Sequence, residues 1–170
     1  MLSETYARIR SSIVAFTPKY PELVDPRRDK YAHLFLIFGT GFIVDDSIIA
    51  TNRHVIELFK TLPKPKDAEN EIPVNALFFT RTGGGIGVCC LNVCNAASIS
   101  KHESSGHRYE TQLPDLALVS VASTGLKKHA MACDPEPVCA GTEIGTAGFP
   151  LGSTLLAPNG ELERFPSVPK

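Results

Sequence analysis

One histidine in this sequence has the local setting that proton-transfer chemistry requires. His54 lies in the segment Thr-Asn-Arg-His-Val (51–55), directly after the apolar run at 47–50. We therefore expect it at the end of a strand, where a rigid scaffold can hold the side chain and still let it reach a cleft. Histidine is also the side chain best matched to proton transfer near neutral pH. His54 is thus a candidate general base.

A carboxylate at the start of another apolar run is a natural partner for such a histidine. Asp115 opens the run Asp-Leu-Ala-Leu-Val-Ser-Val (115–121). A charge beside a strand that must be buried is tolerated when it accepts hydrogen bonds, for instance from a histidine ring N–H. Such a carboxylate fixes the ring tautomer and stabilises the imidazolium, as the acid of a Ser-His-Asp triad does. We therefore expect His54 and Asp115 to lie within hydrogen-bond reach.

The elements that must position these two residues are short strands. Strand-forming runs occur at 12–16, 33–38 with 41–44, 47–50, 74–79, 87–93, 97–101, 116–121 and 143–147. Gly39 and Gly41 suggest a bulge or a close backbone approach, and Asp45 and Asp46 form an acidic hairpin turn. The glycine-rich stretch 82–87 also predicts a hairpin turn, since it lacks the Lys-Ser/Thr ending of a phosphate loop. This pattern predicts an all-β chain built as an antiparallel barrel or sandwich.

Few other elements are expected. A short amphipathic helix is predicted from Ser3 to about Ser12. Two polar stretches, 61–73 and 101–114, break the strand pattern and are predicted to be exposed insertions. The second one holds His102 and His107, but their spacing suits neither one helix face nor one strand face. We therefore predict no metal site and no cofactor.

Three segments, taken in order, resemble the trypsin-like serine peptidases, with the HtrA-like bacterial group as the closest type. Gly-Thr-Gly-Phe-Ile-Val (39–44) with Ala-Thr-Asn-Arg-His-Val (50–55) resembles the region of the catalytic histidine. Pro-Asp-Leu-Ala-Leu-Val (114–119) resembles the strand of the catalytic aspartate. The glycine-rich segment 141–152, which ends in Gly-Phe-Pro-Leu-Gly, is similar to the opening of that family's second barrel.

The resemblance implies the chymotrypsin-type fold, in which two six-stranded antiparallel barrels enclose an active site between them. Residues 1–130 would form a complete first barrel that carries His54 and Asp115, and residues 131–170 would begin an incomplete second barrel. The implied function is that of a serine endopeptidase acting on a protein or peptide substrate by acyl transfer. His54 would be the general base and Asp115 its orienting partner.

The nucleophile of that family is expected after Asp115, within a Gly-x-Ser-Gly-Gly motif, but this sequence contains no Ser-Gly-Gly. Four serines follow Asp115: Ser120, Ser123, Ser153 and Ser167. Ser120 belongs to the predicted strand, Ser123 to a turn, and Ser153 comes too early in the chain, while Ser167 lacks the glycine context of an oxyanion hole. Neither Cys94 nor Cys139 has that context as a cysteine nucleophile. We therefore expect a C-terminally incomplete chain that is inactive alone. The alternative is a catalytically inactive protease-like module or fragment that binds peptides or a protein partner.

Composition excludes other classes of partner. Lys plus Arg (17) nearly equals Asp plus Glu (18), so nothing in the charge favours binding to nucleic acid or to an anionic membrane. No apolar stretch is long enough to span a bilayer, and the N-terminus lacks the pattern of a signal peptide. The five cysteines have irregular spacing without a CxxC pair. We expect small buried residues with free thiols in a reducing, cytoplasmic setting.

Overall fold

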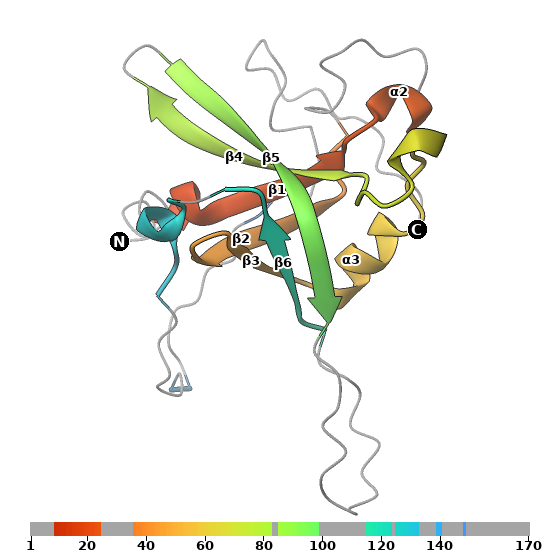
Figure 1. Ribbon diagram of the computed structural model, residues 1–170. Coiled ribbons are helices and arrows are strands. Elements are labelled where there is room, and N and C mark those ends of the chain that lie inside the picture. The colour runs from red at the N-terminus through yellow and green to blue at the C-terminus, as the bar shows by residue number, and fades with distance from the viewer. Residues whose placement is uncertain are drawn as a thin grey trace, which may run out of the picture.

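The main feature of the molecule is a closed six-stranded antiparallel β-barrel with the strand order β1-β2-β3-β6-β5-β4 (Figure 1). The computed structural model describes residues 9–24, 36–82, 85–98, 115–123, 125–132, 139–140 and 148. Its strands are β1 (Ile13–Pro18), β2 (Gly39–Asp45), β3 (Ile48–Thr51), β4 (Val74–Thr82), β5 (Gly85–Ser98) and β6 (Ala117–Val121). The predicted all-β class and antiparallel barrel are confirmed, and the barrel is compatible with the chymotrypsin type.

Helices among the described residues are short. They are η1 (Arg10–Ser12), α2 (Pro21–Val24), α3 (Arg53–Phe59), η3 (Lys66–Ala68) and η4 (Lys127–His129). The predicted N-terminal helix lies largely outside the described residues, and its last three form the 3-10 turn η1. The sequence did not predict α3, which begins two residues after β3 ends. None of the helices described is long and apolar enough to cross a membrane.

The N-terminal half of the barrel depends on close backbone approach at glycine. β2 contains both glycines of the predicted motif and pairs with β1 and β3. A Cβ on Gly41 would lie 2.6 Å from Ile49 Cγ2 and 2.8 Å from the carbonyl oxygen of Ala50, so this position requires glycine. β2 begins at Gly39, so residues 36–38, which the sequence predicts as part of a strand, precede it. The register shift between β2 and β3 falls between Ile43 and Asp45 rather than at the glycines.

The two hairpin turns that the sequence predicts are confirmed. β2 and β3 are joined through Asp45 and Asp46, and Ser47 in this turn adopts a φ of 58°. Asp46 Oδ1 also accepts the backbone N–H groups of Gly125 and Leu126 at 2.6 and 2.7 Å. Pairing of β4 with β5 runs up to Thr82 opposite Gly85, so the glycine-rich stretch turns the chain.

One continuous strand replaces two that the sequence predicts. β5 is 14 residues long and includes both the predicted strand at 87–93 and the start of the one at 97–101. Its first part pairs with β4 and its last part with β6, with a register shift between Val93 and Asn95. A bulge of this kind bends a strand and lets it change partners, which here closes the barrel.

The cysteines differ from the prediction of buried thiols. Cys89, Cys90, Cys94 and Cys139 are free, but only Cys89 is partly buried and the other three are exposed. Neighbouring residues on a strand point to opposite faces. Cys89 therefore packs against the core together with Leu91, whereas Cys90 points outward. Cys133 lies outside the described residues.

The core fills the barrel, and α3 covers it at one end. The largest fully buried side chains are Phe16, Ile43, Ile49, Leu77, Val14, Val74, Val119 and Thr17. The Phe59 ring on α3 packs edge-on against Phe16, at 5.3 Å between ring centroids, and against Phe38 at 5.9 Å. Apolar burial of this extent is the main stabilising contribution to a fold, and it fixes α3 on the barrel.

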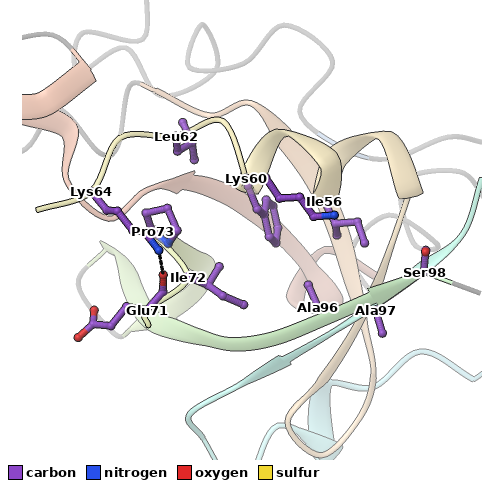
Figure 2. A pocket seen from close by; sticks show the side chains of 11 residues that line it. Ile56, Lys60, Leu62, Lys64, Glu71, Ile72, Pro73, Ala96, Ala97 and Ser98 are labelled. Atoms are coloured by element: carbon purple, nitrogen blue, oxygen red, sulfur yellow. Dashed lines mark hydrogen bonds between the residues drawn. The ribbon is translucent and has the colours of Figure 1, made fainter. Parts of the chain in front are cut away.

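A groove of about 470 Å³ lies between α3, the following loop and the end of β5 (Figure 2). Its lining includes Ile56, Lys60, Leu62 and Ala96. The loop is the predicted insertion at 61–73, which is mostly exposed, although Ala68 in η3 is buried. The predicted insertion at 101–114 and strand at 143–147 lie outside the described residues. So does most of 131–170, and the second part of the chain stays a prediction.

Candidate functional site

The fold brings the two sequence-predicted site residues together at one edge of the barrel. β3 pairs with β6, and Thr51 at the end of β3 lies opposite Ala117 at the start of β6. His54 follows β3 in the first turn of α3, and Asp115 lies two residues before β6. Two residues that are 61 apart in sequence are therefore neighbours in space because two strand ends are adjacent.

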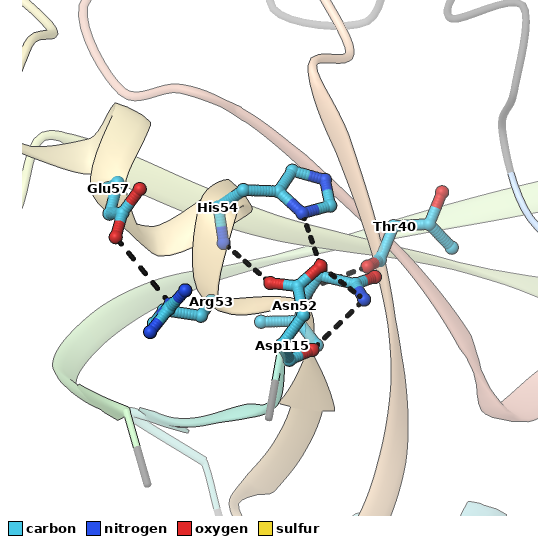
Figure 3. Close-up of polar contacts among 7 residues, drawn as sticks. Thr40, Asn52, Arg53, His54, Glu57 and Asp115 are labelled. Carbon is cyan, nitrogen blue, oxygen red and sulfur yellow. Dashed lines mark hydrogen bonds and ion pairs between the residues drawn. The ribbon is translucent and has the colours of Figure 1, made fainter. Parts of the chain in front are cut away.

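The geometry between them is that of an oriented histidine–carboxylate pair (Figure 3). His54 Nδ1 lies 2.6 Å from Asp115 Oδ2, and the backbone N–H of His54 donates to Asp115 Oδ1 at 3.0 Å. The expected hydrogen-bond reach is thus confirmed. Both oxygens of one carboxylate contact the same histidine, one through the ring and one through the main chain, so the ring and the backbone are held together.

The electrostatics favour an ionised Asp115. The backbone N–H of His54 is the largest influence that holds the pKa of the Asp115 carboxyl below its ordinary value, and the His54 ring and the Asn52 amide act in the same direction. Partial desolvation opposes this lowering. An ionised carboxylate only accepts hydrogen bonds. In the neutral ring the proton is therefore on Nδ1, which leaves the lone pair on Nε2 for a proton from another group.

The ring is accessible on its other side. The His54 side chain is 65% exposed and that of Asp115 is 45% exposed. Within the described part of the chain, the ring makes a single hydrogen bond, to Asp115. Arg53, the preceding residue, pairs instead with Glu57 one helical turn along, with Nε 3.7 Å from Oε1. The pair is therefore oriented at Nδ1 and open at Nε2.

The start of α3 is held closely against β2. Thr51 Oγ1 donates to the carbonyl oxygen of Thr40 at 2.7 Å. A Cβ on Gly39 would lie 2.4 Å from Val55 Cγ1, so the absence of a side chain at Gly39 gives room for the residue after His54. Gly148, the described residue of the segment Gly-Phe-Pro-Leu-Gly, lies against Thr40, since a Cβ there would be 3.2 Å from its Cγ2. These contacts fix where the histidine leaves the barrel.

Two of the other residues considered as nucleophiles, Ser120 and Cys94, make their described contacts away from this pair. Ser120 lies opposite Ile48, at the far end of the β3–β6 ladder from Asp115. Cys94 Sγ donates to the carbonyl oxygen of Asn92, its neighbour on β5. Ser153 and Ser167 lie outside the described residues. Over the described ranges, no cluster of three or more His, Cys, Asp and Glu side chains could hold a metal ion.

The groove beside α3 is separate from the pair. His54 and Leu58 are four residues apart and share one face of α3. The residues that line the groove lie on another face: Ile56, Phe59 and Lys60. Neither His54 nor Asp115 is among its lining residues. The groove therefore belongs to the packing of α3 on β5 rather than to the candidate site.

One residue of the site was missed at the level of sequence. Asn52 donates through its side-chain amide to both the carbonyl oxygen and the carboxylate of Asp115. The sequence analysis predicts no helix after Asn52, and nothing in the sequence connects Asn52 to Asp115. Compared with protein-family models and with curated proteins, the chain matches none.

Proposed function

We propose that this chain carries the general-base half of a serine endopeptidase site of the trypsin-like type. His54 is the general base, and Asp115 orients it. The observation that supports this proposal best is the 2.6 Å contact between His54 Nδ1 and Asp115 Oδ2, made by a carboxylate whose other oxygen accepts the backbone N–H of the same histidine. The closed barrel that holds the pair is of a compatible kind.

In the proposed reaction, Nε2 of His54 takes the proton from a serine hydroxyl as its oxygen attacks the carbonyl carbon of a peptide bond. Asp115 stabilises the imidazolium that forms. His54 then gives this proton to the leaving amine as the C–N bond breaks, which produces an acyl-enzyme. Water attacks the ester in the same way, and its proton passes through Nε2 to the serine oxygen as the acid product leaves.

A second candidate is a protease-like module that binds peptides or a protein partner without hydrolysis. The observation that favours it is the absence of a Ser-Gly-Gly motif from the printed sequence. In this case Asp115 would orient the His54 ring at a binding surface, and the ring would transfer no proton.

The test is covalent labelling with a fluorophosphonate, which reacts with an activated serine. The protein is expressed from its complete natural reading frame, and the labelled peptide is identified by mass spectrometry. We expect one labelled serine on the C-terminal side of Asp115. The labelling rate should fall by roughly three orders of magnitude or more in His54→Ala and in Asp115→Asn.

The matched control is His129→Ala, which removes a histidine of η4 that packs on the Phe78 ring. It should label at the wild-type rate. No labelling of the natural protein, or labelling that survives His54→Ala, would exclude the endopeptidase mechanism. The non-catalytic module would then be the better explanation.

A further inference from the structure

We propose that Asn52 is a positioning residue, whose side-chain amide clamps Asp115 in the one orientation that presents Oδ2 to Nδ1 of His54. The catalytic consequence of this clamp rests on the proposed function, but the clamp itself rests only on the contacts described here. Within the described residues, the hydrogen bonds of the Asn52 side chain go to Asp115 and not to the His54 ring, so it acts through Asp115.

The first observation is that Asn52 does not do what its place predicts. It is the N-cap residue of α3, with an extended backbone (φ −80°, ψ 148°), yet its side chain makes no capping hydrogen bond. An N-cap asparagine normally accepts the N–H of the second or third helical residue. Here the N–H of the second residue, His54, goes to Asp115 Oδ1 instead. Asp115 therefore caps α3 from 61 residues away, and the Asn52 side chain is left for another role.

The second observation is the direction of the Asn52 amide. Nδ2 lies 3.1 Å from the carbonyl oxygen of Asp115 and 3.2 Å from its Oδ2. Both of these atoms only accept hydrogen bonds, so the NH₂ group must face them and the amide oxygen must face away. One nitrogen thus joins the main chain and the side chain of the same residue.

The two contacts together restrict rotation of the Asp115 side chain. Asp115 is 45% exposed, so water could solvate its carboxylate in several rotamers. The Asn52 amide donates to both the carbonyl oxygen and Oδ2 of Asp115, and it therefore favours one of these rotamers. In that rotamer Oδ2 faces the His54 ring and Oδ1 faces the His54 backbone. The clamp thereby sets the ring orientation through the carboxylate.

The test compares Asn52→Ser with Arg53→Ala by NMR in the full natural protein. Serine is a good N-cap residue, so this variant keeps the start of α3 but lacks the amide that reaches Asp115. Two signals are followed: the pH titration of the Asp115 carboxyl carbon and the exchange of the His54 Nδ1 proton with water. In Asn52→Ser we expect the pKa of the Asp115 carboxyl to rise toward its ordinary value, because a donor to the ionised form is lost, and the ring proton to exchange about tenfold faster.

Arg53→Ala changes the neighbouring residue of the same helical turn, whose described partner is Glu57. It should leave both signals at their wild-type values, which separates the clamp from a general weakening of α3. If Asn52→Ser also leaves both signals unchanged, Asn52 does not position Asp115 and the proposal is wrong.

A second measurement needs no variant and covers the case in which Asn52→Ser fails to fold. In the unmodified protein, the side-chain NH₂ signals of Asn52 should shift with the same pH midpoint as the Asp115 carboxyl carbon. NH₂ signals that do not follow this titration would overturn the clamp. A protein that shows the shared midpoint but takes no fluorophosphonate label would retain the clamp and lose the enzymatic function. Labelling without a shared midpoint would support the enzymatic function and overturn the clamp.

Discussion

At the scale of single residues, Asp115 has three roles that usually belong to separate groups. It accepts the ring N–H of His54, caps α3 through the His54 backbone N–H, and receives the Asn52 amide. All three donors stabilise the ionised form. The candidate chemistry and the attachment of α3 to the start of β6 therefore depend on the charge of one carboxylate.

This dependence predicts how stability changes with pH. The pKa of Asp115 is lowered in the folded protein, first by the backbone N–H of His54. Its stabilising contribution is therefore fully present above the ordinary pKa of an aspartate, and it is lost as pH falls through the lowered value. We expect the difference in Tm between wild type and Asp115→Asn to be present at about pH 5. The difference should then shrink as the pH is lowered further.

The measurement is thermal unfolding by circular dichroism across this pH range. Asp67→Asn is the control, since Asp67 lies in the exposed turn η3. Its difference in Tm from wild type should not show this decline at low pH. A difference for Asp115→Asn that grows as the pH falls below about 5 would contradict the prediction.

The sequence could predict the site only in part. His54 and Asp115 could be found because each has a side chain suited to proton transfer and each flanks an apolar run. Asn52 could not, because the sequence predicts neither the helix that follows it nor its long-range contact with Asp115. Either Asn52 or Asp115 could cap α3. The pairing of β3 with β6 brings Asp115 into place for this role, and that pairing depends on contacts between residues far apart in sequence.

At the scale of elements, α3 shows how packing overrides local signals. A helix of seven residues is unstable alone in water, and a segment this short is too brief for its apolar pattern to decide between helix and strand. Its formation depends on Phe59, which packs against Phe16 and Phe38, and on the space at Gly39 for Val55. The bulge in β5 could not be predicted from its sequence either, because it depends on the pairing of this strand with both β4 and β6.

The β2–β3 turn gives a prediction at this scale. Asp46→Ala removes the acceptor of two backbone N–H groups, those of Gly125 and the buried Leu126. Gly125 has a φ of 96°, so this segment follows an unusual path that the carboxylate holds in place. We expect a loss of about 1–3 kcal/mol in the free energy of unfolding, measured by urea denaturation.

Asp45→Ala is the matched control in the same turn. Asp45 Oδ1 accepts only the N–H of the next residue among the interactions described, at 2.8 Å. Because that contact is local and exposed, its loss should cost clearly less than the loss of Asp46. Equal losses for the two variants would mean that Asp46 does not anchor the segment at 125–126.

At the scale of the whole molecule, β1 closes the barrel by pairing on both sides. Val14 lies opposite Gly41 on β2 and opposite Phe78 on β4. The alternation of apolar residues could predict that such strands exist. It could not predict that β3 and β5 would both pair with β6, since pairing partners depend on the path of the chain in space.

Phe16 is the side chain through which this closure can be tested. It is fully buried at the centre of β1 and also packs against Phe59 of α3. Phe16→Ala should destabilise the protein by about 3–5 kcal/mol, a large part of the total of about 5–15 kcal/mol. A double-mutant cycle with Phe59→Ala, followed by urea denaturation, should show coupling between the barrel and the helix.

Val88→Ala serves as the control, because Val88 is a large apolar residue of β5 that is 44% exposed. Its substitution should change the free energy of unfolding by no more than about 0.5 kcal/mol. Additive effects of Phe16→Ala and Phe59→Ala would show that α3 is held independently of β1.

The pairing of β3 with β6 also determines when the site comes into existence. β6 is the last strand of the barrel along the chain, and it alone brings Asp115 to His54. During synthesis the histidine leaves the ribosome well before its carboxylate. The chain must then close a long loop, which is a slow, non-local step. In a nascent or half-folded chain His54 is therefore not yet oriented. It becomes an oriented proton acceptor only when β6 pairs with β3 and brings Asp115 to its ring.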